Sequence, residues 1–310
     1  MSQPTKRFPD FLIIGAGKSG TTSIDKYIGT HPHIYMSERK DPGFFASEPY
    51  NLSDDMYPES VAYYQRFITN ESEYLRLFSL AKPDQLTGET TTMYLYSEGS
   101  PDRIRSYIPD TKLIAVLRQP AERIFSRYLH LARENQLPTD SFEDIFDQNS
   151  KWWIRPDLIN EGFYFKHLKR FYDIFPEEHI QVILYDEMKE NQETMFRNLF
   201  QFLGVEEDFV PETDISYNQS GFIKNKWVNK VVGYNNPFVR ILRKTSPGLL
   251  NTLKSNKAVL KGLNSIRSKN LHRPGLSVDL KKKITEEIYM KDIVQLEKLI
   301  GRDLSKWRII

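Results

Sequence analysis

An apolar run followed directly by a glycine-rich loop constrains the fold of this 310-residue chain more than any other feature. The run spans Phe11 to Ile14, and the residues after it are Gly15-Ala16-Gly17-Lys18-Ser19-Gly20-Thr21-Thr22-Ser23. A short apolar run bounded by turn residues is typical of a strand that is buried on both faces of a parallel sheet. We expect a helix to begin near Thr21 and to run towards Gly29, so that the glycines form the turn between strand and helix.

Two further pairs of strand and helix follow along the chain. Lys112 to Leu117 is apolar, and helical periodicity follows it from Ala121 to Glu134; Ile180 to Leu184 is apolar, and a helix is expected from Glu187 to Leu203. Strands that alternate with helices predict an α/β fold with a central parallel sheet, a three-layer α/β/α arrangement of P-loop-like topology. The segment from Asp279 to Ile300 is predicted to be one amphipathic helix.

The composition excludes several kinds of chemistry. The sequence has no cysteine, which excludes disulfides, thiolate metal sites and a cysteine nucleophile. Residues 1–10 contain no apolar run of the kind found in signal peptides, and no stretch approaches the roughly 20 apolar residues of a membrane helix. We therefore expect a cytoplasmic protein with no transmembrane segment.

Positive charge is concentrated in one part of the chain, although the formal net charge is only +2. No acidic residue occurs between Asp214 and Asp279, and this stretch contains Lys224, Lys226, Lys230, Arg240, Arg243, Lys244, Lys254, Lys257, Lys261, Arg267, Lys269 and Arg273. Such a block attracts anions, unless it is simply the solvated face of a helix. We expect a single domain over residues 1–310, with residues 221–275 as a helical basic cap or a substrate-side insertion.

The glycine loop has the features of an anion site. Glycines let successive backbone N–H groups point into one concavity, and the start of a helix adds partial positive charge. Gly15 and Gly20 fit the spacing of the Walker A motif, but Thr21 stands where that motif requires lysine, and Lys18 precedes the second glycine instead. This departure counts against an ATPase or a GTPase. The alternative is a turn whose glycines serve packing alone.

A second anion site is predicted where the strand ending at Leu117 gives way to a helix. Arg118 follows the strand, and ligands of open parallel sheets bind at the carboxyl ends of the strands. Pro120 suits the first turn of a helix, and Ser126 lies about two turns further on. An arginine fork and a hydroxyl can hold one terminal phosphate from two sides.

The two segments together resemble the sulfotransferases, especially the heparan sulfate and carbohydrate type and its bacterial relatives. The order K-x-G-T-T resembles their 5′-phosphosulfate loop, and L-R-x-P-x-E-R-x-x-S-x-Y resembles their 3′-phosphate motif. The resemblance implies that 3′-phosphoadenosine-5′-phosphosulfate (PAPS) is the sulfuryl donor and that no metal is needed. Arg118 and Ser126 then hold the 3′-phosphate. The residues implied at the 5′-phosphosulfate are Lys18, Ser19, Gly20, Thr21, Thr22 and Ser23. Lys18 is also implied in catalysis, since its charge would lie against the oxygen that bridges sulfate and phosphate.

A carboxylate base is predicted after the glycine loop. The segment K-D-P-G-F-F, which starts at Lys40, resembles the K-E-P-x-F-F of the family, in which the glutamate is the general base. Asp41 occupies that place with a side chain one methylene shorter, and Lys40 is expected to contact the acceptor. A carboxylate that only initiates the turn before Pro42 is the alternative interpretation of Asp41. Other candidates for the base are Glu38, Glu89, His31 and His33.

Two further segments resemble the family. Gly88 to Tyr94 is similar to G-E-x-[ST]-P-x-Y, with Thr92 in place of the proline and Thr90 in place of the lysine of the animal enzymes. Glu89 is therefore expected either to bind the acceptor or to shape the site. The loop that ends at Gly221 is similar to an N-x-S-G loop that closes over PAPS, so that Lys224 or Lys226 would contact a phosphate.

The predicted activity is in-line transfer of the sulfuryl group of PAPS to an acceptor hydroxyl or amine, with a carboxylate as general base. A saccharide is the acceptor implied first by the resemblance, while a lipid and a small metabolite alcohol stay open, as does the oligomeric state. Nucleic acid is not an expected partner. Two other functions compete with this one. A P-loop nucleotide kinase would depend on Mg²⁺, and a non-catalytic module would bind an anionic polymer in a salt-sensitive manner.

Overall fold

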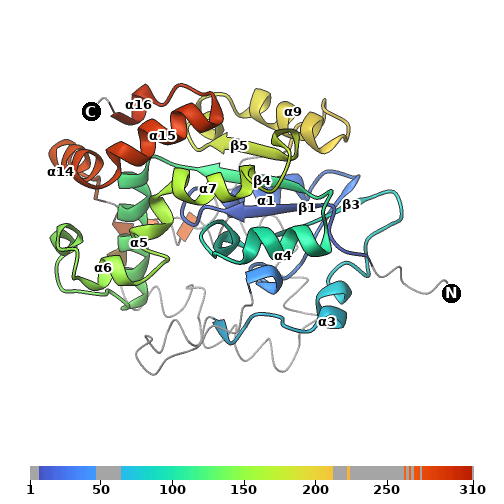
Figure 1. Cartoon of the computed structure of the whole chain (residues 1–310), viewed down its shortest axis with the longest axis horizontal. Coiled ribbons are helices and arrows are strands. Elements are labelled where there is room, and N and C mark those ends of the chain that lie inside the picture. Colours follow the sequence, from blue (N-terminus) through green and yellow to red (C-terminus); the bar gives the residue numbers. More distant parts are fainter. Residues whose placement is uncertain are drawn as a thin grey trace. The chain divides into compact units, whose positions relative to one another are not determined.

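The centre of the molecule is a parallel β-sheet with the strand order β2-β3-β1-β4-β5 (Figure 1). The computed structural model describes residues 7–46, 64–211 and 274–308, together with a few residues between 222 and 272. The strands of this sheet are β1 (Phe11–Gly15), β2 (Ile34–Met36), β3 (Leu86–Thr90), β4 (Lys112–Leu117) and β5 (Ile180–Leu184). The expected strands at β1, β4 and β5 are thus confirmed, and β2 and β3 complete the sheet.

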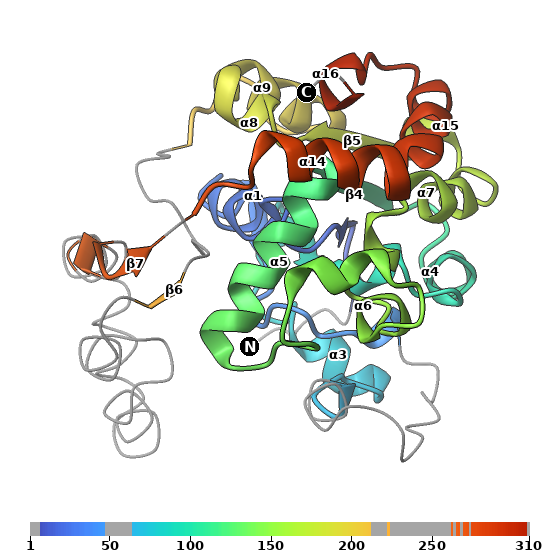
Figure 2. The same ribbon diagram turned by 90° about the vertical axis from the view of Figure 1, so that its left-hand side faces the viewer.

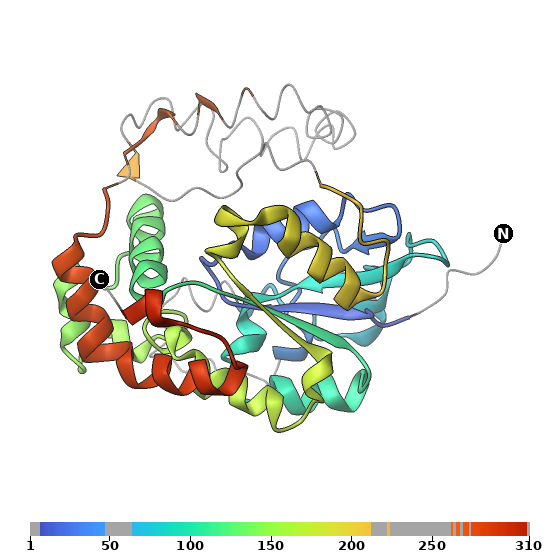
Figure 3. The same cartoon turned by 90° about the horizontal axis from the view of Figure 1, so that it is seen from above.

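Helices cover both faces of the sheet, which confirms the three-layer arrangement. α1 (Thr21–Ile28) and α9 (Gln192–Leu203) lie on one face, and α4 (Ser100–Tyr107) and α7 (Tyr164–Tyr172) lie on the other (Figure 3). All five residues of β1 are buried, as the apolar run predicts for a central strand.

The remaining helices are short, apart from α5 and α15. They are η1 (Phe44–Ala46), α3 (Glu71–Arg76), η2 (Thr92–Leu95), α5 (Pro120–Glu134), η3 (Phe142–Phe146), α6 (Lys151–Ile154), η4 (Asn160–Gly162), η5 (Glu177–His179), α8 (Glu187–Glu190), α14 (Val278–Ile284), the π-helical segment η6 (Thr285–Tyr289), α15 (Met290–Ile300) and α16 (Ser305–Arg308). The expected helix over residues 121–134 is confirmed as α5.

Two helices that the sequence predicts as continuous are interrupted. The helix expected from Glu187 to Leu203 is divided into α8 and α9 by Asn191, whose ψ of 59° is not helical. The helix expected from Asp279 to Ile300 contains the π-helical segment η6. Thr285 begins that segment, and its hydroxyl donates to the carbonyl of Lys281 at 2.8 Å. Such bonds compete with the regular helical pattern.

The chain divides into two compact units. One contains residues 1–124, 138–212 and 277–310, and therefore the whole parallel sheet; the other contains residues 125–137 and 213–276. In the second unit, β6 (Phe222–Ile223) and β7 (Leu271–His272) pair in antiparallel fashion (Figure 2). Most of the basic stretch 221–275, including Lys224 and Lys226, lies outside the described residues. Its role as a cap on a single domain stays a prediction.

Candidate active site

Three loops meet at the carboxyl edge of the sheet, where β1, β3 and β4 are neighbours. The backbone N–H of Ala16 donates to the carbonyl of Val116 at 2.8 Å, and the N–H of Thr91 donates to the carbonyl of Ile13 at 3.0 Å. These bonds hold the glycine loop between the segment after β3 and the segment after β4, which begins with Arg118. The glycine loop and Arg118 therefore lie at the same edge, as the sequence predicts.

The glycine loop adopts a conformation that suits an anion. Lys18 has φ 67° and Gly20 has φ 98°, both in the left-handed region. Gly20 is the N-cap of α1, and in the described part of the chain no side chain caps that helix and no acidic residue lies in its first turn. A Cβ atom at position 20 would lie 3.0 Å from Met188 Sδ and 3.2 Å from Tyr185 Cδ2, so the loop requires glycine there for space as well as for its φ.

A buried ion pair between Arg123 and Glu161 is hydrogen-bonded to the glycine loop. Glu161 Oε1 accepts a hydrogen bond from the N–H of Gly17 at 2.6 Å, and Glu161 Oε2 accepts one from Arg123 Nη1 at 2.9 Å. Arg123 also donates to the carbonyl of Leu158. The side chains of Arg123 and Glu161 are only 0% and 2% exposed. Sequence analysis missed both residues. Arg123 is the second arginine of the 3′-phosphate motif, whereas Glu161 belongs to no motif.

Arg118 is held by two neighbours. Its Nε and Nη2 atoms donate to Glu122 Oε2 at 3.2 and 3.0 Å, and its guanidinium carbon lies 4.8 Å from the centre of the Tyr185 ring. The N–H of Tyr185 in turn donates to the carbonyl of Leu117 at 2.7 Å. Because Tyr185 also lies next to Gly20, its ring is adjacent to both predicted anion sites. Its position directly after β5 is the only signal of it in the sequence.

Ser126 lies within α5, the helix that begins two residues after Arg118. It belongs to the second compact unit. Its share in a phosphate site with Arg118 therefore stays a prediction, as do the contacts of Lys224 and Lys226.

Asp41 lies against the end of β3. Its N–H donates to the carbonyl of Thr90 at 2.8 Å, and its Oδ1 accepts from the N–H of Thr92 at 3.2 Å. Its φ of 53° is left-handed, a conformation that aspartate tolerates better than most residues. The neighbouring Lys40 donates from Nζ to the hydroxyl of Thr22 in the first turn of α1. Lys40 thus reaches the glycine loop, and its expected contact with the acceptor stays a prediction.

Glu89 is enclosed by three hydroxyl donors. Its Oε1 accepts from Tyr94 at 2.6 Å and from Tyr74 at 3.2 Å, and its Oε2 accepts from Thr91 at 2.8 Å. Burial raises the pKa of Glu89 to about 8, the charge of nearby Asp41 adds to this rise, and the three hydrogen bonds oppose it. The side chain has no solvent exposure. This arrangement favours a role in shaping the site over direct contact with an acceptor.

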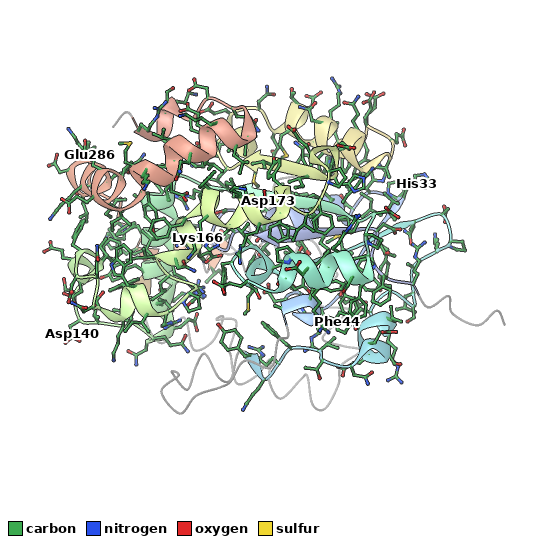
Figure 4. The ribbon with its side chains drawn as sticks, in the orientation of Figure 1. His33, Phe44, Asp140, Lys166, Asp173 and Glu286 are labelled. Carbon is green, nitrogen blue, oxygen red and sulfur yellow. The ribbon has the colours of Figure 1, made fainter. Side chains whose placement is uncertain are left out.

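The histidine candidates lie at the opposite edge of the sheet. The N–H of Leu86, where β3 begins, donates to the carbonyl of His33 at 2.8 Å, and Figure 4 shows His33 near the amino-terminal ends of the strands. His31 is buried between Phe200 and Phe209, and a ring nitrogen lies 3.1 Å from the carbonyl of Glu206. Both imidazoles therefore lie away from the glycine loop, whereas Asp41 is bonded to Thr90 and Thr92 at the carboxyl end of β3.

The parallel sheet, the glycine loop and the arginine at the next strand end define an α/β protein of the P-loop-like class. The sulfotransferase domain family matches residues 8–240, and the chain belongs to that family. This membership confirms the resemblance and favours it over a nucleotide kinase and over a polymer-binding module.

Several characterised proteins are similar to the chain. Bifunctional heparan sulfate N-deacetylase/N-sulfotransferase 1 of Caenorhabditis elegans is 28% identical over 220 residues, which cover 69% of this chain and 24% of that protein. Heparan sulfate glucosamine 3-O-sulfotransferase 3A1 of Mus musculus is 25% identical over 228 residues, which cover 71% of this chain and 51% of that protein. The matches therefore span only part of these relatives.

A solved structure matches over nearly the full length of both chains. The crystal structure of a sulfotransferase from Alicyclobacillus acidocaldarius has a TM-score of 0.71 and 28% sequence identity, and the match covers 97% of this chain and 99% of that one. None of the helices in the part of the chain that the structure describes has the length and apolar character of a transmembrane span.

Proposed function

We propose that the chain is a PAPS-dependent sulfotransferase that transfers a sulfuryl group to a hydroxyl or an amine of a saccharide. One observation carries the proposal: the glycine loop and Arg118 follow neighbouring parallel strands, and the Tyr185 ring is adjacent to both. Two anion sites at one sheet edge suit a ligand with a phosphate at each end, as in adenosine that is phosphorylated at its 3′ and 5′ positions. Family membership supports the same donor.

The donor is assigned to the two loops as follows. PAPS supplies the activated sulfuryl group. The uncapped start of α1, together with the charge of Lys18, suits the 5′-phosphosulfate, and Arg118 with Ser126 suits the 3′-phosphate. The residues assigned to the 5′ end are Lys18, Ser19, Gly20, Thr21, Thr22 and Ser23. Lys224 and Lys226 are assigned to the phosphates by resemblance.

Asp41 is proposed as the general base. It accepts the proton of the acceptor hydroxyl or amine while the bond from that atom to sulfur forms and the bond from sulfur to the phosphate oxygen breaks. Lys18 neutralises the charge that the departing phosphate oxygen gains. Loss of one such charged contact costs ~3 kcal/mol in the activation barrier. The hydrogen bond from the Thr92 amide orients Asp41, and Thr92 itself lies next to Gly15 of the glycine loop.

A saccharide acceptor is supported by the relatives. Both of the enzymes compared above are named for heparan sulfate, one for N-sulfation and the other for 3-O-sulfation. A screen with radiolabelled PAPS tests this choice. The panel contains a saccharide with free amines, its N-acetylated form, a long-chain alcohol and a small polar alcohol. We expect label in a saccharide; label only in the lipid or in the small alcohol would overturn the acceptor assignment.

Calorimetry with the product nucleotide tests the donor assignment. Adenosine 3′,5′-bisphosphate is titrated with and without Mg²⁺, and adenosine 5′-monophosphate is titrated in parallel. We expect metal-independent binding of the bisphosphate and much weaker binding of the monophosphate. No binding of the bisphosphate at millimolar concentration would remove the proposed function.

A further inference from the structure

We infer that Lys281, in helix α14, belongs to the 3′-phosphate site and offsets the negative charge of Glu122, which otherwise neutralises Arg118. The inference rests on the proposed function and adds a residue from a part of the chain that neither motif covers.

One carboxylate bridges two cations at this site. Glu122 Oε2 accepts from Arg118 Nη2 at 3.0 Å, and Glu122 Oε1 accepts from Lys281 Nζ at 2.9 Å. α14 lies beside the first turns of α5 in Figure 2, as this contact requires. The side chains of Arg118, Glu122 and Lys281 are 20%, 28% and 23% exposed, so solvent screens these charges only in part.

The charges of the three groups decide whether an anion can bind. Arg118 and Glu122 alone sum to zero, and a neutral pair attracts a phosphate monoester poorly, since that group carries about −1.5 to −2 at pH 7. Burial works to raise the pKa of Glu122, but Lys281 and Arg118 together hold it below its ordinary value. Glu122 is therefore ionised at neutral pH. Adding Lys281 makes the sum of the three charges positive, which is what a phosphate site needs.

The position of Lys281 is fixed by buried contacts, unlike that of an ordinary surface lysine. Gln119 is 3% exposed, and its Nε2 donates to Thr285 Oγ1 at 2.8 Å and to the carbonyl of Trp307 at 3.3 Å. Gln119 Oε1 accepts from the N–H of Glu122 at 2.8 Å. The turn between β4 and α5 is thus attached to the segment that contains Lys281, and Thr285 also bonds the Lys281 carbonyl.

The test measures how strongly the protein prefers a 3′-phosphate. Calorimetry gives the dissociation constants of adenosine 5′-monophosphate and of adenosine 3′,5′-bisphosphate. The first constant divided by the second measures how much the 3′-phosphate strengthens binding. We expect Lys281→Met to lower this ratio about tenfold, on the scale of a lost charged hydrogen bond, with little change for the monophosphate. The matched control is Lys282→Met in the same helix, because that side chain is 58% exposed and pairs only loosely with Glu286, at 3.9 Å. An unchanged ratio in folded Lys281→Met protein would overturn the inference.

A double variant tests the compensation of charge. Glu122→Gln combined with Lys281→Met has the same net charge over the three positions as the wild type, and the glutamine oxygen can still accept from Arg118. We expect the ratio to recover towards the wild-type value. If the ratio does not recover in the double variant, Lys281 does not act by offsetting the charge of Glu122, and the inference is wrong. A wild-type protein without any preference for the bisphosphate would instead overturn the proposed function itself.

Discussion

The carboxylate of Glu161 accepts a hydrogen bond of 2.6 Å from the backbone amide of Gly17 and so fastens the glycine loop to the protein interior. The same carboxylate pairs with Arg123 in α5, the helix that begins just after Arg118. The carboxylate of Glu161 therefore links the glycine loop, which is assigned to the 5′-phosphosulfate, with the helix that follows Arg118, which is assigned to the 3′-phosphate.

Glu161→Gln is expected to destabilise the protein by about 3–5 kcal/mol, because it leaves the buried Arg123 without its charged partner. The glutamine oxygen can still accept from Gly17. Denaturant unfolding measures the change. The double variant Arg123→Met with Glu161→Gln should recover part of the loss, since no unpaired charge then stays buried.

The control for this pair is a salt bridge on the surface. Lys169 and Asp173 are 2.6 Å apart, but their side chains are 51% and 55% exposed. Asp173→Asn should therefore change stability by no more than about 1 kcal/mol. Equal effects of Glu161→Gln and Asp173→Asn would contradict the role assigned to Glu161.

Asp41→Asn is expected to lower kcat by about 10²–10⁴-fold and to leave the affinity for adenosine 3′,5′-bisphosphate nearly unchanged, because a general base acts on the acceptor proton. Steady-state kinetics and calorimetry measure the two quantities. Glu38→Gln is the matched control, since Glu38 is an exposed carboxylate only three residues away. If Asp41→Asn keeps full turnover while Glu38→Gln loses it, the base is Glu38.

Glu89 should give stability a dependence on pH. Burial raises its pKa in the folded protein to about 8, from the ordinary value of 4.5. Between these values the folded state holds a proton that the unfolded state has released, so the free energy of unfolding falls as the pH rises, by up to about 1.4 kcal/mol per unit. Asp292, with a pKa of about 6, contributes in the same direction at lower pH.

Glu89→Gln should remove this fall between pH 7 and 8. Urea unfolding at several pH values in that interval measures the slope for both proteins. Burial lowers the pKa of His31 and His167 below the ordinary value of 6.5, so these two groups make stability rise with pH near that value, but their contribution is the same in wild type and variant and cancels when the two slopes are compared. The same slope in wild type and variant would show that Glu89 is already ionised at neutral pH.

The central strands and the two anion loops were predictable, because local sequence specifies them. Continuous apolar runs identify β1, β4 and β5, and the glycines and Arg118 directly follow two of these strands. β2 has only three residues, too few to show a pattern. The break at Asn191 and the π-helical turn at Thr285 depend on backbone geometry that an amphipathic pattern does not report.

The supporting residues of the site could not be predicted, because their partners are distant in the chain. Glu161 is 144 residues from Gly17, and Lys281 is 159 residues from Glu122. Neither occurs in a recognisable motif, and an isolated acidic or basic residue is most often a solvated surface group. Their contacts follow from the packing of η4 and α14 around α5, which only the three-dimensional fold specifies.

Lys40 is assigned to the acceptor by the sequence, but its position in the structure favours the donor. Its Nζ contacts the Thr22 hydroxyl in the first turn of α1. If Lys40 acts at the donor, Lys40→Met should raise the KM for PAPS about tenfold or more and leave the KM for the acceptor nearly unchanged. Kinetics with each substrate varied in turn distinguish the two cases. Arg39→Met is the control, since that side chain pairs with Glu73 at 3.4 Å and donates to the carbonyl of Arg66. A rise confined to the acceptor KM would return Lys40 to the acceptor site.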